Sequence, residues 1–157
     1  MKPFLYFAAP LFSQAELAFN ERVCAELEPF FNVYLPQRDG GLIGQTVGKG
    51  GLSAENALAR TFAMDIAAID RSDVVLLVLD GRTVDEGAAF EIGYAFAKGK
   101  VCVGLQTDPR RLVPWGNNPM ITGPLVNLFS TVESLVAWAG SFAPLVAPIQ
   151  RGAKAPL

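Results

Sequence analysis

The sequence predicts an α/β fold, a doubly wound, mostly parallel five-stranded sheet with helices on both faces, in the flavodoxin-like or Rossmann-like three-layer arrangement. Three observations predict it. Segments typical of strands alternate along the chain with segments typical of helices. The segment 74–79, VVLLVL, is unbroken, branched and apolar, as a strand covered on both faces must be. The length of 157 residues fits a single domain, 1–157.

Local signals place the elements in chain order. We expect strands at 4–9, 32–35, 74–79 and 101–105, and helices at 13–30, 53–69, 87–98 and 130–139. Ser13 caps the first helix with Glu16 as its capping-box partner, and Gly99 ends the third. The glycine-rich stretch 36–51 is predicted to be a mobile loop, with 40–51 as a lid, and the tail from Pro144 to be loosely held.

Composition excludes several classes of function. The formal net charge is −2 without a basic run, so the chain lacks the electrostatic pattern of a nucleic-acid binder. No segment approaches the roughly 18 apolar residues of a membrane span, and Pro10 interrupts an N-terminal apolar run too short for a signal peptide. Cys24 and Cys102 lie in apolar surroundings and are expected to be reduced core thiols. We therefore expect a cytoplasmic protein.

The sequence contains no histidine. This excludes Ser-His-Asp and Cys-His catalytic systems, histidine-ligated zinc or iron, and a histidine general base. Catalysis by this chain would have to use carboxylates, tyrosine, lysine or thiol groups.

Two acidic residues stand out on predicted helices. Glu91 has only small or apolar helical neighbours and tyrosine one turn away, and Asp65 lies on or beside the core-facing stripe of its helix. A buried, unpaired carboxylate is costly, so it must be hydrogen-bonded, neutral or functional. The alternative is a solvated glutamate on a helix surface. Asp70 and Asp73, at the end of a helix and the start of a strand, are read as structural.

Two further residues point to the crevice outside the carboxyl ends of the strands, where open parallel sheets bind ligands. The Tyr6 hydroxyl could reach it from the first strand, or could simply pack in the core. Asp85 precedes a helix and fits an N-cap, and in that place it would repel a phosphate and accept a hydrogen bond from a hydroxyl group. The segment 44–50 lacks the spacing of a phosphate loop, and no dinucleotide glycine motif follows the first strand.

Three blocks of the chain resemble the nucleoside 2-deoxyribosyltransferases. They are YFAAPLF at 6–12, LPQRDG at 35–40 and DGRTVDEGAAFEIGYA at 80–95, followed by GK at 99–100. The block at 80–95 is the most specific of them. The likeness extends over nearly the whole chain, and it implies the same fold.

The resemblance also implies roles for individual residues. Glu91 is the expected nucleophile, Tyr6 bonds it, Asp65 serves the base, and Asp85 holds the sugar 5′-hydroxyl. The remaining substrate-binding positions are Gln37 near the nucleobase, Gly87 within the main block, and Asn127, which a neighbouring subunit contributes. The active form is then a homo-oligomer, at least a dimer.

These residues predict transfer of the 2-deoxyribosyl group between nucleobases by a retaining double displacement, without metal or cofactor. The expected partners are 2′-deoxynucleosides and free nucleobases. A related N-glycosidase that uses water, acting on nucleosides or their 5′-monophosphates, is the nearest alternative. A catalytically silent nucleoside-binding protein is a further one, whereas a receiver domain would need an acidic pair after the first strand, where the sequence has Ala8-Ala9-Pro10.

Overall fold

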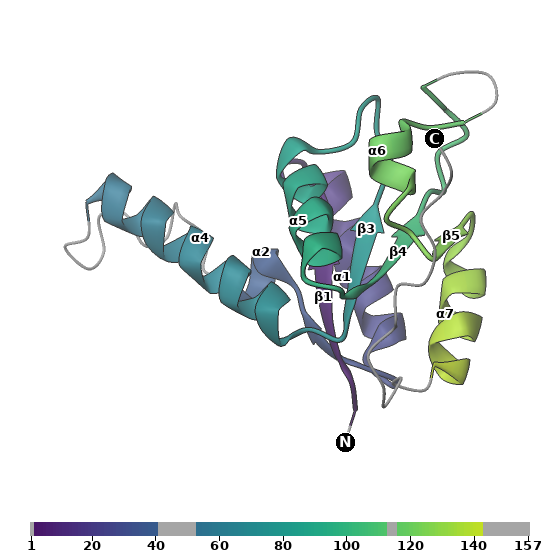
Figure 1. Ribbon diagram of the computed structural model, residues 1–157, viewed down its shortest axis with the longest axis horizontal. Helices are drawn as coiled ribbons and strands as arrows, with labels where there is room; N and C mark the ends of the chain where they lie inside the picture. Colours follow the sequence, from purple (N-terminus) through teal and green to yellow (C-terminus); the bar gives the residue numbers. More distant parts are fainter. Residues whose placement is uncertain (1, 41–52, 113–115, 143–157) are drawn as a thin grey trace, which may run out of the picture.

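The structure is a computed structural model that describes residues 2–40, 53–112 and 116–142. Five parallel strands form one sheet in the order β2-β1-β3-β4-β5 (Figure 1). The strands are β1 Phe4–Ala8, β2 Asn32–Tyr34, β3 Val74–Val78, β4 Val101–Leu105 and β5 Asn127–Phe129. This is the flavodoxin-like order, whose switch point lies between β1 and β3. The predicted fold class is confirmed.

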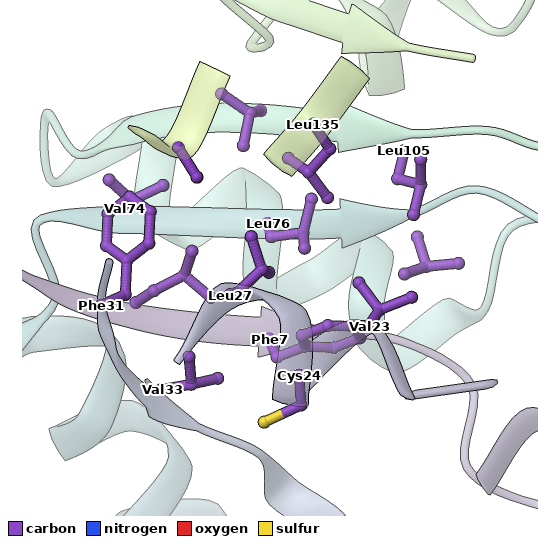
Figure 2. Packing of buried hydrophobic residues seen from close by; sticks show 14 of the residues in the cluster. Phe7, Val23, Cys24, Leu27, Phe31, Val33, Val74, Leu76, Leu105 and Leu135 are labelled. Carbon is purple, nitrogen blue, oxygen red and sulfur yellow. The ribbon is translucent and has the colours of Figure 1, made fainter. Parts of the chain in front are cut away.

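Helices cover both faces of the sheet. They are α1 Gln14–Leu27, α2 Pro36–Asp39, α4 Ala54–Arg71, α5 Glu86–Ala97, α6 Pro119–Thr122 and α7 Val132–Ser141. On one face, α1 and α7 pack on an apolar cluster that includes Phe7 and Leu76 (Figure 2). On the other face, α4 and α5 pack on a cluster that includes Tyr6 and Ile92. Because side chains alternate along a strand, Phe7 and Tyr6 face opposite layers.

Helix α4 is only partly packed on the sheet. Its second half buries Ala68 and Ile69, whereas in its first half Leu58 and Phe62 are 55% and 59% exposed. Figure 1 shows this first half extending beyond the sheet. Asp65 lies between the two halves and is half-buried.

The predicted helix ends follow from local chemistry with one clear exception. Both hydrogen bonds of the capping box between Ser13 and Glu16 are present, and Gly99 takes a positive φ of 74° just after α5. The helix predicted at 13–30 ends earlier, at Leu27. Pro29 explains the difference, because it has no N–H group to continue the hydrogen-bond ladder.

Three short elements were not located in the sequence. The stretch after β2 begins with the one-turn helix α2 instead of a loop, and α6 and β5 precede the last helix. Strand β5 has three residues, two of them exposed, so it lacks the buried apolar run that identifies β3. Residues 41–52, which hold most of the predicted lid, and the tail from Pro144 lie outside the described residues.

The two cysteines are free and buried on opposite sides of the sheet. Cys24, a residue of α1, packs in the cluster between α1 and the sheet (Figure 2), and Cys102 packs in the cluster between α5 and the sheet. The sheet separates them, so they cannot pair without rearrangement. Burial raises the pKa of each thiol to about 11, which keeps both protonated. Over the described ranges, no helix is both long and apolar enough to cross a bilayer.

Candidate active site

A short hydrogen bond in the α4/α5 layer joins Tyr6 to Glu91. Tyr6 is the third residue of β1 and is fully buried. Its hydroxyl donates a hydrogen bond of 2.5 Å to Oε1 of Glu91 on α5. Ala88 and Ala95, one turn to either side of Glu91, are buried against the sheet, and this turns the carboxyl group inward. Glu91 is therefore partly shielded from bulk solvent.

The environment of Glu91 favours its neutral form. Burial raises its pKa to about 8, and the nearby charges of Asp65 and Asp85 act in the same direction. The hydrogen bond from Tyr6 opposes them, because it stabilises the carboxylate. Three carboxyl groups thus interact at this point, contributed by α4, by α5 and by the turn before α5.

The second acid, Asp65, accepts a hydrogen bond from Tyr34, which was not among the predicted site residues. The hydroxyl of Tyr34, on β2, donates a hydrogen bond of 3.1 Å to Oδ1 of Asp65. Burial raises the pKa of Asp65, and the bond from Tyr34 partly offsets this. The sequence signal for Tyr34 was its place in the strand predicted at 32–35, which the structure pairs with β1.

Tyr6 and Tyr34 form a stacked pair beneath the two acids. They are directly opposite each other in the register of β1 and β2, and their ring centroids lie 5.5 Å apart at an interplanar angle of 17°. Burial, together with the negative charge of Glu91 for Tyr6 and of Asp65 for Tyr34, raises the pKa of both phenols well above the usual range. Both hydroxyl groups therefore remain protonated donors.

Asp85 caps the helix that follows it, as the sequence predicts. It is the N-cap of α5, and its Oδ1 accepts a hydrogen bond of 2.8 Å from the backbone N–H of Ala88. Within the described residues its Oδ2 has no hydrogen-bond partner. A Cβ at Gly87 would lie 3.1 Å from Oδ1 of Asp85, so the glycine leaves that carboxylate its space.

A hollow of about 340 Å³ opens beside Asp85 at the carboxyl ends of β1 and β3. It lies at the switch point, where open parallel sheets bind ligands, and the described residues that line it do not include Tyr6, Asp65 or Glu91. Among the described residues that line it, the charged ones are Glu16, Asp80, Asp85, Glu86 and Arg82. Four carboxylates against one guanidinium make the hollow suited to hydroxyl groups and unfavourable for a phosphate.

The structure does not bring Gln37 and Asn127 into this cluster. The Gln37 amide is engaged on α1, where it donates to the Leu17 carbonyl and accepts from Asn20. Asn127 is exposed at the start of β5, three strands from β1, which is about 14 Å at normal strand spacing. The base contact of Gln37 and the contribution of Asn127 to a neighbouring subunit therefore stay predictions.

The two aspartates read as structural have structural partners. Asp70 accepts a hydrogen bond from the Tyr94 hydroxyl and pairs with Lys98, and Asp73 accepts from the backbone of Phe4. Over the described ranges, no group of three acidic, thiol or imidazole side chains is arranged to hold a metal ion.

Comparison with known proteins adds to this geometry. The model of the nucleoside 2-deoxyribosyltransferase family matches residues 5–136. No curated protein sequence matches the chain significantly. A conserved protein from Enterococcus faecalis V583 is 27% identical, with a TM-score of 0.72 over 90% of this chain and 99% of that one.

Two structures of lower identity share the fold. The 2-deoxyribosyltransferase from Bacillus psychrosaccharolyticus is 22% identical, with a TM-score of 0.66 over 84% of this chain and 89% of that one. The CMP N-glycosidase BcmB from Clostridium botulinum is 17% identical, with a TM-score of 0.54 over 87% of this chain and 97% of that one.

The fold and the cluster together define a flavodoxin-like α/β domain that gathers partly buried carboxyl groups beside the switch point of its sheet. The family match covers most of the chain. The chain belongs to the nucleoside 2-deoxyribosyltransferase family, whose members are enzymes that act on the N-glycosidic bond of nucleosides.

Proposed function

We propose that the protein transfers the 2-deoxyribosyl group between nucleobases through a covalent ester of Glu91 with C1′ of the sugar. The observation that carries this proposal is the position of Glu91, a partly buried carboxyl group that accepts a hydrogen bond from Tyr6 and lies near Asp65 and Asp85. Glu91 forms no ion pair within the described residues. A carboxyl group kept there despite the cost of burial is better suited to chemistry than to stabilising the fold.

In the first half-reaction, the Glu91 carboxylate attacks C1′ while the bond between C1′ and the base nitrogen breaks. The electron pair of that bond leaves with the base, and Asp65 donates the proton that makes the base a better leaving group. Positive charge develops on the sugar ring, and the adjacent Glu91 carboxylate stabilises it before the ester forms.

The second half-reaction reverses these steps with another base. The incoming nitrogen loses its proton to Asp65 and attacks C1′, the ester bond breaks, and Glu91 leaves as a carboxylate. Two displacements at C1′ give net retention. If water takes the place of the second base, the same site hydrolyses the nucleoside.

The hollow beside Asp85 supports nucleosides over nucleotides as substrates. Oδ2 of Asp85 is unpaired within the described residues and can accept a hydrogen bond from a 5′-hydroxyl. A 5′-phosphate there would meet the four carboxylates of the hollow. The proposed partners are therefore 2′-deoxynucleosides and free nucleobases, and a 5′-monophosphate N-glycosidase is disfavoured on charge.

We extend the proposal to a homo-oligomer in which Asn127 reaches the 5′-hydroxyl in a neighbouring subunit. Its exposed place on the edge strand β5 supports this, because it is far from the Tyr6 of its own chain and open to a second copy.

The test is base exchange. The protein is incubated with one 2′-deoxynucleoside and a different free base, and chromatography follows the new deoxynucleoside. We expect exchange in the wild type, none with Glu91→Ala, and full exchange with the control Glu26→Gln, which alters an exposed glutamate on α1. Free deoxyribose without exchange would identify a hydrolase instead, and binding without turnover would identify a nucleoside-binding protein.

A further inference from the structure

We propose that Tyr34 positions Asp65 for proton transfer: its hydroxyl holds one carboxyl oxygen and leaves the other to carry the proton exchanged with the nucleobase. This inference rests on the proposed function of Asp65. It adds a positioning residue on β2, a strand that contributes no other residue to the cluster.

The placement of Tyr34 follows from the register of the sheet. Parallel pairing sets Tyr34 opposite Tyr6, so both rings point into the α4/α5 layer, where they stack. Tyr34 is only 8% exposed, and the stack fixes its ring. The two hydroxyl groups then reach different acids, Tyr6 the carboxyl group of Glu91 and Tyr34 that of Asp65. Each acid thus has its own tyrosine donor.

The two oxygens of Asp65 have different surroundings. Oδ1 accepts the hydrogen bond of 3.1 Å from Tyr34, and it lies 3.2 Å from the point that a Cβ at Gly40 would occupy. The structure gives Oδ2 no hydrogen-bond partner within the described residues. Because Oδ1 accepts the hydrogen bond from Tyr34, we assign the carboxylic acid proton to Oδ2.

This asymmetry fits both half-reactions. When the C1′–N bond breaks, Oδ2 gives its proton to the departing base and Asp65 becomes a carboxylate. Tyr34 then stabilises the new charge through the bond to Oδ1. When the second base attacks, Oδ2 takes the proton from its ring nitrogen, and the neutral acid is restored. Tyr34 itself keeps its proton throughout.

Other ionisable groups act on the same pair. The titratable groups that face Asp65 from neighbouring strands and from α5 are Tyr6, Tyr34 and Glu91. Asp39 and Arg71 act on Tyr34 with opposite signs. The phenol of Tyr34 is nevertheless the one group that donates a hydrogen bond to Asp65 within the described residues.

A double-mutant cycle tests the proposal. We compare base exchange by the wild type, Tyr34→Phe, Asp65→Asn and the double variant. Tyr34→Phe keeps the stacked ring and removes only the hydroxyl group. We expect kcat to fall about tenfold, which is part of the usual contribution of a general acid, and KM to change less than about threefold. With Asp65→Asn already present, Tyr34→Phe should cost less than about twofold, because its partner is gone. An equal loss in both backgrounds, or no loss in either, would overturn the proposal.

A second readout does not depend on turnover. With the aspartate carboxyl carbons labelled with ¹³C, the Asp65 resonance is assigned by its disappearance in Asp65→Asn. Tyr34→Phe removes a bond that stabilises the carboxylate, so the pKa of Asp65 should rise. The matched control is Tyr94→Phe, which removes a similar hydrogen bond to Asp70, outside the cluster. An unmoved Asp65 resonance would overturn the role of Tyr34, whereas absence of base exchange in the wild type would contradict the proposed function.

Discussion

The Tyr6 hydroxyl lies 2.5 Å from Oε1 of Glu91, and this bond counteracts the burial that raises the pKa of that carboxyl group to about 8. Tyr6→Phe should therefore raise the Glu91 pKa further and leave less carboxylate at pH 7. We expect kcat/KM at pH 7 to fall about tenfold, which corresponds to a rise of about one unit in the Glu91 pKa. Titration of ¹³C-labelled glutamate carboxyl groups measures the pKa directly, and the same midpoint in both proteins would contradict this account.

The partly buried Glu91 should also make the stability of the protein depend on pH. The native state binds its proton up to about pH 8, whereas a glutamate in the unfolded chain loses it near pH 4.5. Between these values the native state holds more protons, so its stability falls as pH rises. The free energy of unfolding of Glu91→Gln should equal that of the wild type near pH 4.5. At pH 8.5 it should be higher by a few kcal/mol, because each tenfold change in the ionisation constant corresponds to ~1.4 kcal/mol.

Urea unfolding of both proteins across this range measures the effect. The control Glu26→Gln alters an exposed side chain and should show the pH dependence of the wild type. A constant difference between Glu91→Gln and the wild type at all pH values would mean that Glu91 is not the group responsible.

Asp85→Ser should shift preference from nucleosides towards nucleoside 5′-monophosphates. Serine keeps the N-cap of α5, so the helix is retained, while the charge beside the hollow is removed and space is gained. We expect KM for the deoxynucleoside to rise about tenfold, the loss of one hydrogen bond to a charged group. The ratio of kcat/KM for the two substrates is the measurement, and an unchanged ratio would place the 5′-hydroxyl elsewhere.

Mixing two inactive variants tests the proposed role of Asn127. Glu91→Ala and Asn127→Ala should each lack most activity as purified. In a mixed dimer, one site combines the intact Glu91 of one chain with the intact Asn127 of the other. Unfolding and refolding the two variants together should give mixed dimers in about half of the cases, each with one competent site of two. The mixture should therefore recover up to about a quarter of wild-type activity. If the mixture is no more active than its parts, Asn127 does not act across subunits.

The sequence was most informative for elements that are buried along their whole length. It was least informative for side-chain contacts that depend on how strands pair and helices pack. The run at 74–79 identified the central strand, because complete burial requires unbroken apolar residues. Glu91 was singled out for the opposite reason, as an acid among small and apolar residues, and its catalytic role stays a prediction. Tyr34 could not be recognised in the same way, because its role depends on the β1–β2 register and on where α4 places Asp65. The contacts of Gln37 with α1 likewise depend on how α1 and α2 pack.

The burial of Cys24 and Cys102 on opposite faces of the sheet provides two built-in reporters of motion. A thiol reagent can reach Cys24 only when the α1 layer opens, and Cys102 only when the α5 layer opens. Mass spectrometry of singly labelled chains would therefore distinguish local opening of the α4/α5 layer from local opening of the α1/α7 layer. A bound nucleoside should slow modification of Cys102 more than that of Cys24.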